Sequence, residues 1–74
     1  MNNLASIKIG IIGATGAVGV ETLKLLSEIN HPLDNIFLFA SERSVGKFIK
    51  YKNSEIEILE TSNENLKKID IGFI

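Results

Sequence analysis

Three glycines, Gly13, Gly16 and Gly19, recur at every third position between an apolar run and a run with helical spacing. Where a strand turns through glycines into a helix, outward-pointing backbone N–H groups and the helix dipole can hold a phosphate, and no Cβ blocks its approach. The spacing therefore predicts a site for the pyrophosphate of a dinucleotide cofactor.

Each glycine of this motif has its own expected role. We expect Gly13 to let the chain turn sharply, Gly16 to let the backbone approach the pyrophosphate, and Gly19 to let the helix pack close to the sheet. A plain strand-end turn is the alternative for Gly13. Thr15 can add a hydroxyl to a phosphate oxygen, and it can also cap the helix.

A second polar group, Ser41-Glu42-Arg43-Ser44, follows another apolar run. An acidic residue at this place commonly binds the ribose 2′-OH of NAD, whereas an arginine accommodates the 2′-phosphate of NADP. The hydroxyls of Ser41 and Ser44 and the guanidinium of Arg43 are donors suited to a phosphate, which favours NADP. Glu42 leaves open the NAD role, or a surface pairing with Arg43.

A strand, a helix and a second strand must position these residues. Residues 7–12 and 35–40 are nearly continuous apolar runs, which are typical of parallel strands covered on both faces. Residues 17–29 predict a helix between them, which completes a right-handed βαβ unit. The stripe expected to face the sheet comprises Val18, Thr22, Leu25, Leu26 and Ile29.

The second half of the chain predicts smaller elements. Residues 48–51 and 56–59 are expected to form a hairpin joined by residues 52–55. Thr61 and Glu64 have the spacing of a capping box, which starts a short helix to about residue 68.

Residues 70–74 begin a further apolar strand. Because a native chain rarely ends on such a strand, and because only one substantial helix is present, we expect a truncated domain. The predicted class is α/β, the N-terminal part of a Rossmann-type NAD(P)-binding domain with a mostly parallel sheet. Residues 1–74 would form this partial dinucleotide-binding domain.

Composition narrows the function classes. With a net charge of −1 and a pI near 5.7, the 74 residues give no electrostatic reason to bind nucleic acid. The absence of cysteine excludes disulfides, thiolate metal sites and a cysteine nucleophile within this sequence. No apolar run approaches the ~20 residues that span a bilayer. No signal peptide is recognisable, so a cytoplasmic location is expected.

Three other polar side chains have plain structural interpretations. His31, which precedes a proline, is expected to be a loop residue, and Tyr51 is expected to serve packing. Lys47 fits a solvated face, although it is close enough in sequence to reach a cofactor phosphate. No metal-ligand cluster and no catalytic nucleophile–base arrangement is visible.

Residues 11–19 and 38–47 together resemble bacterial aspartate-semialdehyde dehydrogenase, and residues 69–74 resemble the strand that leads to a further cofactor-contacting loop in that family. Many nucleotide-binding proteins share the glycine motif, but its combination with Ala-Ser-x-Arg-Ser-x-Gly-Lys is more specific. The resemblance extends over the chain from residue 7 onward. The matching positions are Thr15, Gly16, Ala17 and Val18 in the phosphate-contacting turn, and Ser41, Arg43 and Ser44 in the 2′-phosphate loop.

This resemblance implies an enzyme that reduces aspartyl phosphate to the semialdehyde with NADPH, towards lysine, threonine and methionine. The family uses a thioester-forming cysteine, a histidine acid/base and substrate-binding arginines. None of these maps onto the present residues, so no catalytic residue is assigned and the chain alone is expected to be inactive. The resemblance also implies a homodimer, formed largely through the catalytic and dimerisation domain that this chain lacks.

Three alternatives stay open. N-acetyl-glutamyl-phosphate reductase performs the same type of reaction and shares the glycine turn, although residues 41–47 fit it less well. A non-catalytic sensor or epimerase-like protein could use the same glycine spacing to bind NADP. A free-standing small binding module is a third possibility, and a cooperative thermal transition would favour it.

Overall fold

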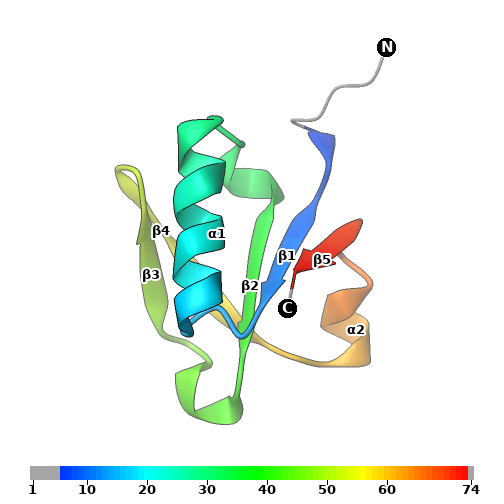
Figure 1. Cartoon of the computed structure of the whole chain (residues 1–74). Helices are drawn as coiled ribbons and strands as arrows, with labels where there is room; N and C mark the ends of the chain where they lie inside the picture. Colours follow the sequence, from blue (N-terminus) through cyan, green and yellow to red (C-terminus); the bar gives the residue numbers. More distant parts are fainter. Residues whose placement is uncertain (1–5, 74) are drawn as a thin grey trace.

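A computed structural model describes residues 6–73 of the chain. Within these residues, five strands form one sheet in the order β3-β4-β2-β1-β5 (Figure 1). The elements are β1 (Ile9–Ile12), α1 (Ala17–Glu28), β2 (Ile36–Ala40), β3 (Phe48–Tyr51), β4 (Ser54–Glu60), α2 (Asn63–Leu66) and β5 (Ile71–Phe73), with the short 3-10 helices η2 (Leu33–Asn35) and η3 (Glu42–Ser44) beside β2.

The sheet is mostly parallel, as predicted. β1 pairs in parallel with β2 and with β5, and β2 pairs in parallel with β4. Only β3 runs antiparallel, because it forms a hairpin with β4. The register places Ile12 opposite Phe39, so β1 and β2 end side by side. The predicted α/β class and βαβ unit are therefore confirmed.

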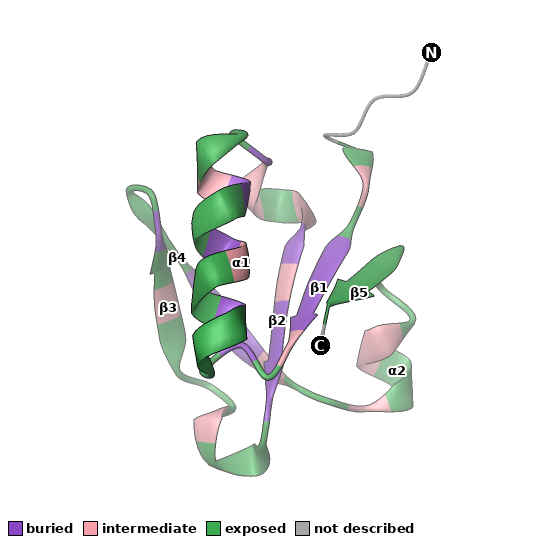
Figure 2. Cartoon of the chain, in the orientation of Figure 1, coloured by how far each residue is buried: buried purple, intermediate pink, exposed green. Residues whose placement is uncertain are grey.

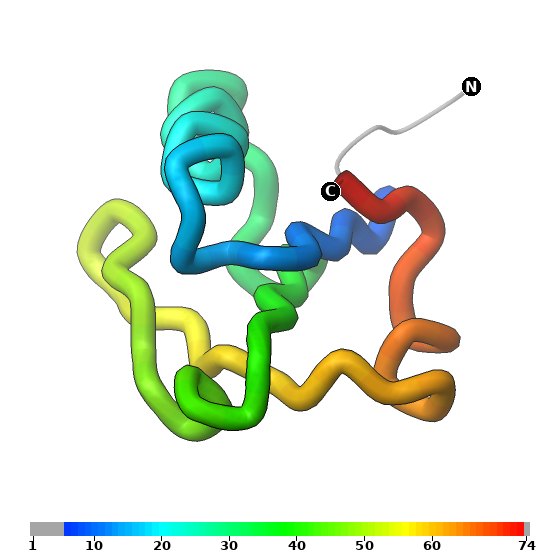
Figure 3. Tube along the Cα trace, turned by 60° about the horizontal axis from the view of Figure 1, so that its bottom comes forward, coloured from blue at the N-terminus to red at the C-terminus, as the bar shows by residue number. Residues whose placement is uncertain are grey.

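The two helices lie on opposite faces of the sheet (Figure 3). Leu23 and Leu26 of α1 are buried in the main apolar cluster. On the other face, Phe39 is fully buried. A Cβ added at Gly10 would overlap the side chain of Ile69 and lie 2.9 Å from Cε2 of Phe39, so Gly10 admits close packing there. The strand residues clustered with α1 are Ile9, Ile11, Ile36, Leu38, Ala40, Tyr51, Ile56 and Ile58.

The predicted sheet-facing stripe of α1 is confirmed at Leu26 but wrong at three of its other positions. The helix is buried through Gly19, Leu23 and Leu26, at spacings of four and three residues. Three members of the predicted stripe are exposed instead: Val18 at 63%, Leu25 at 60% and Ile29 at 67%. Apolar residues cover a face of this helix wider than the sheet can bury, so periodicity alone could not set its rotation. The contact between Gly19 and the backbone of Ala14 sets it.

Several element boundaries also differ from the predictions. β1 begins at Ile9 rather than at residue 7, and α1 ends at Glu28, one residue early. The hairpin is confirmed, but β4 begins at Ser54, so the turn is shorter than residues 52–55. β5 matches the predicted last strand over residues 71–73, and residue 74 lies outside the described residues.

The short helix α2 is capped by Ser62 and not by Thr61. The hydroxyl oxygen of Ser62 accepts a hydrogen bond from the Asn65 amide at 3.1 Å. Thr61 points elsewhere, since its hydroxyl donates to the carbonyl of Ala40 at 3.2 Å. The helix ends at Leu66, before the predicted residue 68. Thr61 therefore fixes the end of β2 instead of starting α2.

Tyr51 and His31 join three segments on the face of the sheet that α1 covers. The Tyr51 hydroxyl oxygen lies 2.7 Å from the carbonyl of His31 and 3.0 Å from that of Leu26. The His31 ring is buried, and its Nε2 lies 2.9 Å from the carbonyl of Ile7. Burial raises the pKa of Tyr51 above its ordinary value of 10.0. Both residues are structural: His31 lies in a loop and Tyr51 serves packing, as predicted.

Burial is concentrated on the central strands β1 and β2, whereas β5 at the sheet edge is exposed (Figure 2). Neither helix in residues 6–73 is long and apolar enough to cross a membrane.

Candidate cofactor site

The two predicted groups of site residues lie at the same edge of the sheet. The glycine turn (residues 13–19) follows β1, and the 41–47 loop follows β2, which runs parallel beside it. From β1 the chain leads through α1 to β2 on one side, while α2 leads to β5 on the other side. Open α/β sheets bind ligands at such a switch point, outside the carboxyl ends of the strands.

The start of the glycine turn is fixed by the end of β2. The amides of Gly13 and Ala14 both donate to the carbonyl of Phe39, at 2.8 and 3.0 Å. The Gly16 amide donates to the carbonyl of Gly13 at 3.0 Å. Gly13 has φ +77°, a left-handed conformation that favours glycine, so its predicted role in a sharp turn is confirmed. These three amides are occupied and do not face a ligand.

The amides that follow are differently placed. Gly16 is the N-cap of α1, no side chain caps the helix, and its first turn holds no acidic residue. The predicted capping role of Thr15 is therefore wrong, and its side chain is exposed. The N–H groups of Ala17 and Val18 stand in the first turn, where no intrahelical acceptor exists, and the positive end of the helix dipole is not offset by a carboxylate. An anion bound there would accept hydrogen bonds from both amides and would interact favourably with the helix dipole.

The other two glycines differ in what surrounds them. A Cβ added at Gly19 would lie 2.7 Å from the Cα and carbonyl oxygen of Ala14, so the helix packs closely on the turn, as predicted for this residue. A Cβ at Gly16 would meet only the Gly13 carbonyl oxygen, at 3.4 Å. Internal packing therefore demands glycine at position 19, whereas position 16 keeps space open on the outer side of the turn.

The 41–47 loop surrounds a polar hollow of about 600 Å³. Within the loop, η3 is closed by the Ser44 amide, which donates to the carbonyl of Ser41 at 2.9 Å. The side chains of Ser41, Glu42 and Arg43 are exposed and that of Ser44 is half-buried. Five residues line the hollow: Ser41, Glu42, Arg43, Ser44 and Lys47.

A second hollow, of about 230 Å³, lies between α1 and β3 and is mainly apolar. Val20, Leu23, Ile49 and Tyr51 supply its apolar lining. Lys24, Lys50 and Lys52 also line it, but it borders neither the turn nor the 41–47 loop. The polar hollow, which the predicted 2′-phosphate residues line, is therefore the candidate site. Among residues 6–73, no group of three His, Cys, Asp or Glu side chains could hold a metal ion.

Sequence reasoning missed the backbone supports of this site. The Phe39 carbonyl holds the turn, and the Thr61 hydroxyl holds the last carbonyl of β2. Main-chain acceptors leave no trace in a side-chain pattern, so no signal could have indicated the Phe39 contact. Lys47 had only its nearness in sequence to suggest that it borders the hollow.

Comparison with known proteins identifies the family to which this chain belongs. The family described as "Semialdehyde dehydrogenase, NAD binding domain" matches residues 8–74. The chain belongs to this family. A nicotinamide dinucleotide is thereby confirmed as the class of cofactor. The family description does not separate NAD from NADP.

Individual relatives confirm the resemblance to aspartate-semialdehyde dehydrogenase. Aspartate-semialdehyde dehydrogenase of Aquifex aeolicus is 46% identical over 66 residues, which cover 88% of this chain and 19% of the relative. The Helicobacter pylori protein of that name is 46% identical over 67 residues, again covering 88% and 19%. The chain therefore spans about a fifth of the length of these relatives.

Solved structures support the fold. Aspartate semialdehyde dehydrogenase II of Vibrio cholerae, in a complex with ASA, superimposes with a TM-score of 0.77 at 35% identity, over 89% of this chain and 22% of that one. A probable aspartate-semialdehyde dehydrogenase of Pseudomonas aeruginosa gives a TM-score of 0.78 at 27% identity, over 90% and 20%. The predicted Rossmann-type arrangement is confirmed.

Proposed function

We propose that this chain is the NADP-binding N-terminal portion of an aspartate-semialdehyde dehydrogenase. The dinucleotide would lie across the carboxyl ends of β1 and β2. Its pyrophosphate would contact residues 15–18, and its 2′-phosphate would contact Ser41, Arg43 and Ser44. The nicotinamide supplies hydride-transfer chemistry when the cofactor is bound.

The bare N-terminus of α1 is the observation that carries this proposal. The amides of Gly13, Ala14 and Gly16 donate to carbonyls within the protein, whereas those of Thr15, Ala17, Val18 and Gly19 donate to no backbone carbonyl. We infer that Thr15, Ala17 and Val18, whose residues are exposed, offer their amides to the pyrophosphate. An anion there gains direct hydrogen bonds and the favourable field of a 12-residue helix. Because Gly16 has no Cβ, a pyrophosphate can come close to this backbone.

The polar hollow supports NADP over NAD. Ser41 and Ser44 offer hydroxyl donors, and the Arg43 guanidinium can bind a phosphate through two parallel hydrogen bonds. Glu42 lines the same hollow and would suit the ribose 2′-OH of NAD. The two hydroxyls and the guanidinium can donate hydrogen bonds to a phosphate, and only one carboxylate would repel it, so this set of side chains favours a 2′-phosphate over a 2′-OH.

The activity of a complete protein is a further part of the proposal. It would reduce L-aspartyl 4-phosphate to L-aspartate 4-semialdehyde with NADPH, in the cytoplasm, as a homodimer, and so serve lysine, threonine and methionine biosynthesis. The names of the relatives support this substrate over that of N-acetyl-glutamyl-phosphate reductase. Residues 1–74 would form one partial dinucleotide-binding domain that lacks a catalytic cysteine and is inactive alone.

Replacement of Arg43 tests the cofactor assignment. We expect Arg43→Ala to weaken NADP binding by about tenfold to a hundredfold, the worth of a charge-assisted hydrogen-bond pair, and to change NAD binding by less than about twofold. Calorimetric titration with each oxidised dinucleotide measures this ratio. Lys67→Ala, which removes an exposed cation beside α2, is the control and should change neither affinity. Equal losses for both dinucleotides would remove the 2′-phosphate role of Arg43.

A further inference from the structure

Lys47 is one of the residues that line the polar hollow, and two backbone hydrogen bonds fix its position. Its amide donates to the carbonyl of Ser44 at 3.1 Å, which links it to the loop. Its carbonyl accepts from the Ile58 amide at 2.8 Å, which links it to β4. The lysine therefore stands at a fixed point of the loop, while its ammonium group ends a flexible stem.

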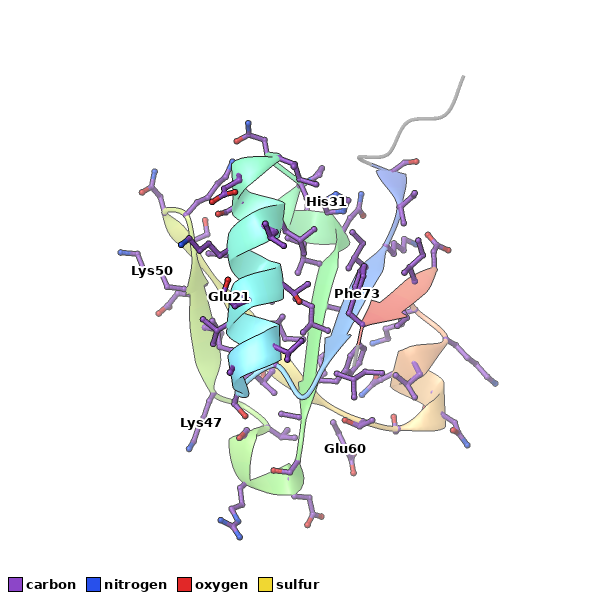
Figure 4. All side chains as sticks on the ribbon, viewed as in Figure 1. Glu21, His31, Lys47, Lys50, Glu60 and Phe73 are labelled. Carbon is purple, nitrogen blue, oxygen red and sulfur yellow. The ribbon has the colours of Figure 1, made fainter. Side chains whose placement is uncertain are left out.

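Gly46 sets the direction of the chain at this point. Its φ of +88° is left-handed, and no atom lies within 4 Å of a Cβ built on it, so the backbone conformation and not crowding requires glycine. The Gly46 amide donates to the carbonyl of Ile58 at 3.0 Å. The bend brings Lys47 back beside the loop just before β3 begins, and Figure 4 shows Lys47 at the sheet edge to which the loop belongs.

The charges around the hollow explain why a second cation matters. Glu42 contributes one negative charge, and Arg43 and Lys47 contribute one positive charge each. Without Lys47 the hollow would be neutral overall. A phosphate monoester carries about −1.5 to −2 charges near pH 7, whereas the 2′-OH of NAD carries none.

We propose that Lys47 binds the 2′-phosphate as a second cation, and that Lys47 and Glu42 set the preference between the two dinucleotides in opposite directions. This inference rests on the proposed function, and it adds residues that determine specificity at the same site. Arg43 supplies a planar, two-pronged contact, and Lys47 supplies the net positive charge. Glu42 keeps a residual affinity for the 2′-OH of NAD.

The test compares variants of the 74-residue chain by calorimetric titration with NADP and with NAD. Lys47→Met keeps the apolar stem and removes the charge. We expect it to weaken NADP by about tenfold and NAD by less than about twofold, whereas Lys47→Arg should retain the preference. Glu42→Gln should tighten NADP about threefold and weaken NAD, since it removes one repulsive carboxylate. Lys50→Ala is the matched control, because Lys50 is exposed, lies in β3 just after the loop and does not line the polar hollow. It should change neither the NADP nor the NAD affinity.

The outcomes separate this inference from the proposed function. If the unaltered chain binds NADP no more tightly than NAD, the proposed NADP preference fails and this inference fails with it. If the unaltered chain prefers NADP but Lys47→Met leaves the ratio of affinities unchanged, only the role of Lys47 is overturned. Equal weakening of both dinucleotides by Lys47→Met, with Lys47→Arg no better, would also overturn it, because a loss of structure and not of charge would then be the cause.

Discussion

The glycine turn and the 41–47 loop meet at one sheet edge but offer a ligand different chemistry. The turn presents main-chain amides at a bare helix N-terminus, and its Ala14 is 2% exposed. The loop presents hydroxyls and charges on largely exposed side chains. Main-chain donors suit the pyrophosphate that NAD and NADP share, whereas side chains can distinguish their 2′ groups. Affinity and selectivity are therefore expected to reside in separate segments.

The two segments also differ in how they are built into the fold. The turn is fixed by two hydrogen bonds to the Phe39 carbonyl and by the contact between Gly19 and Ala14. The loop is fixed by backbone hydrogen bonds to Ile58 of β4, and most of the side chains that line its hollow are exposed. A substitution at Gly19 in the turn should thus affect folding, whereas substitutions of the exposed loop side chains should affect cofactor binding and not stability.

The largest expected effect is on stability, from Gly19→Ala. The new Cβ would lie 2.7 Å from backbone atoms of Ala14, which cannot move without disturbing the turn. We expect a loss of about 2 kcal/mol in the free energy of unfolding, since overpacking outweighs the better helix propensity of alanine. Urea denaturation followed by circular dichroism measures it. Val20→Ala, an exposed position on the same helix, should change stability by less than about 0.5 kcal/mol. A Gly19→Ala variant as stable as the unaltered chain would contradict the structural role given to the contact between Gly19 and Ala14.

Gly16→Ala should weaken binding without discriminating between cofactors. The φ of −83° at this position suits alanine, and the nearest atom to its Cβ lies at 3.4 Å, so the fold should lose less than about 1 kcal/mol. The methyl group would occupy space needed by the pyrophosphate. We expect NAD and NADP to weaken together by about tenfold in calorimetric titrations. A change confined to NADP would contradict the division of labour between turn and loop.

The smallest expected effect on stability comes from Tyr51→Phe, at the end of β3 in the hairpin that follows the loop. Loss of the hydroxyl that contacts the His31 and Leu26 carbonyls should cost about 1 kcal/mol of stability at neutral pH. Because burial raises the pKa of Tyr51 in the folded protein, the unfolded chain loses this proton first. The stability contributed by Tyr51 is thus complete below about pH 10 and falls as the pH rises through the folded-state pKa. The difference between the two proteins in urea denaturation should therefore shrink as the pH rises above about 10. A difference that grows with pH would show that the hydroxyl is not held as described.

The sequence was sufficient for the order of elements and for the sheet edge that carries the site. Continuous apolar runs marked β1 and β2, and glycine spacing marked the turn between β1 and α1. The polar residues after β2 pointed to the loop that surrounds the hollow. These features are local, so residue types and their spacing were enough to reveal them.

What depends on tertiary contact could not be predicted in the same way. The rotation of α1 is set by Gly19 against Ala14, and an apolar pattern that includes Val18 and Leu25 fits two rotations equally well. Ser62 and not Thr61 caps α2, because the Thr61 hydroxyl donates to the carbonyl of Ala40 at the end of the neighbouring strand β2. Such distant partners are not visible in local spacing.

The most direct test of the central claim is an NMR titration of the isotope-labelled chain with NADPH, followed at the backbone amides of the turn. We expect the resonances of Thr15, Ala17 and Val18 to shift most, while those of Gly13 and Ala14, which donate to the Phe39 carbonyl, shift less. Unmoved resonances at residues 15–18 in the presence of saturating NADPH would contradict a pyrophosphate site at the start of α1.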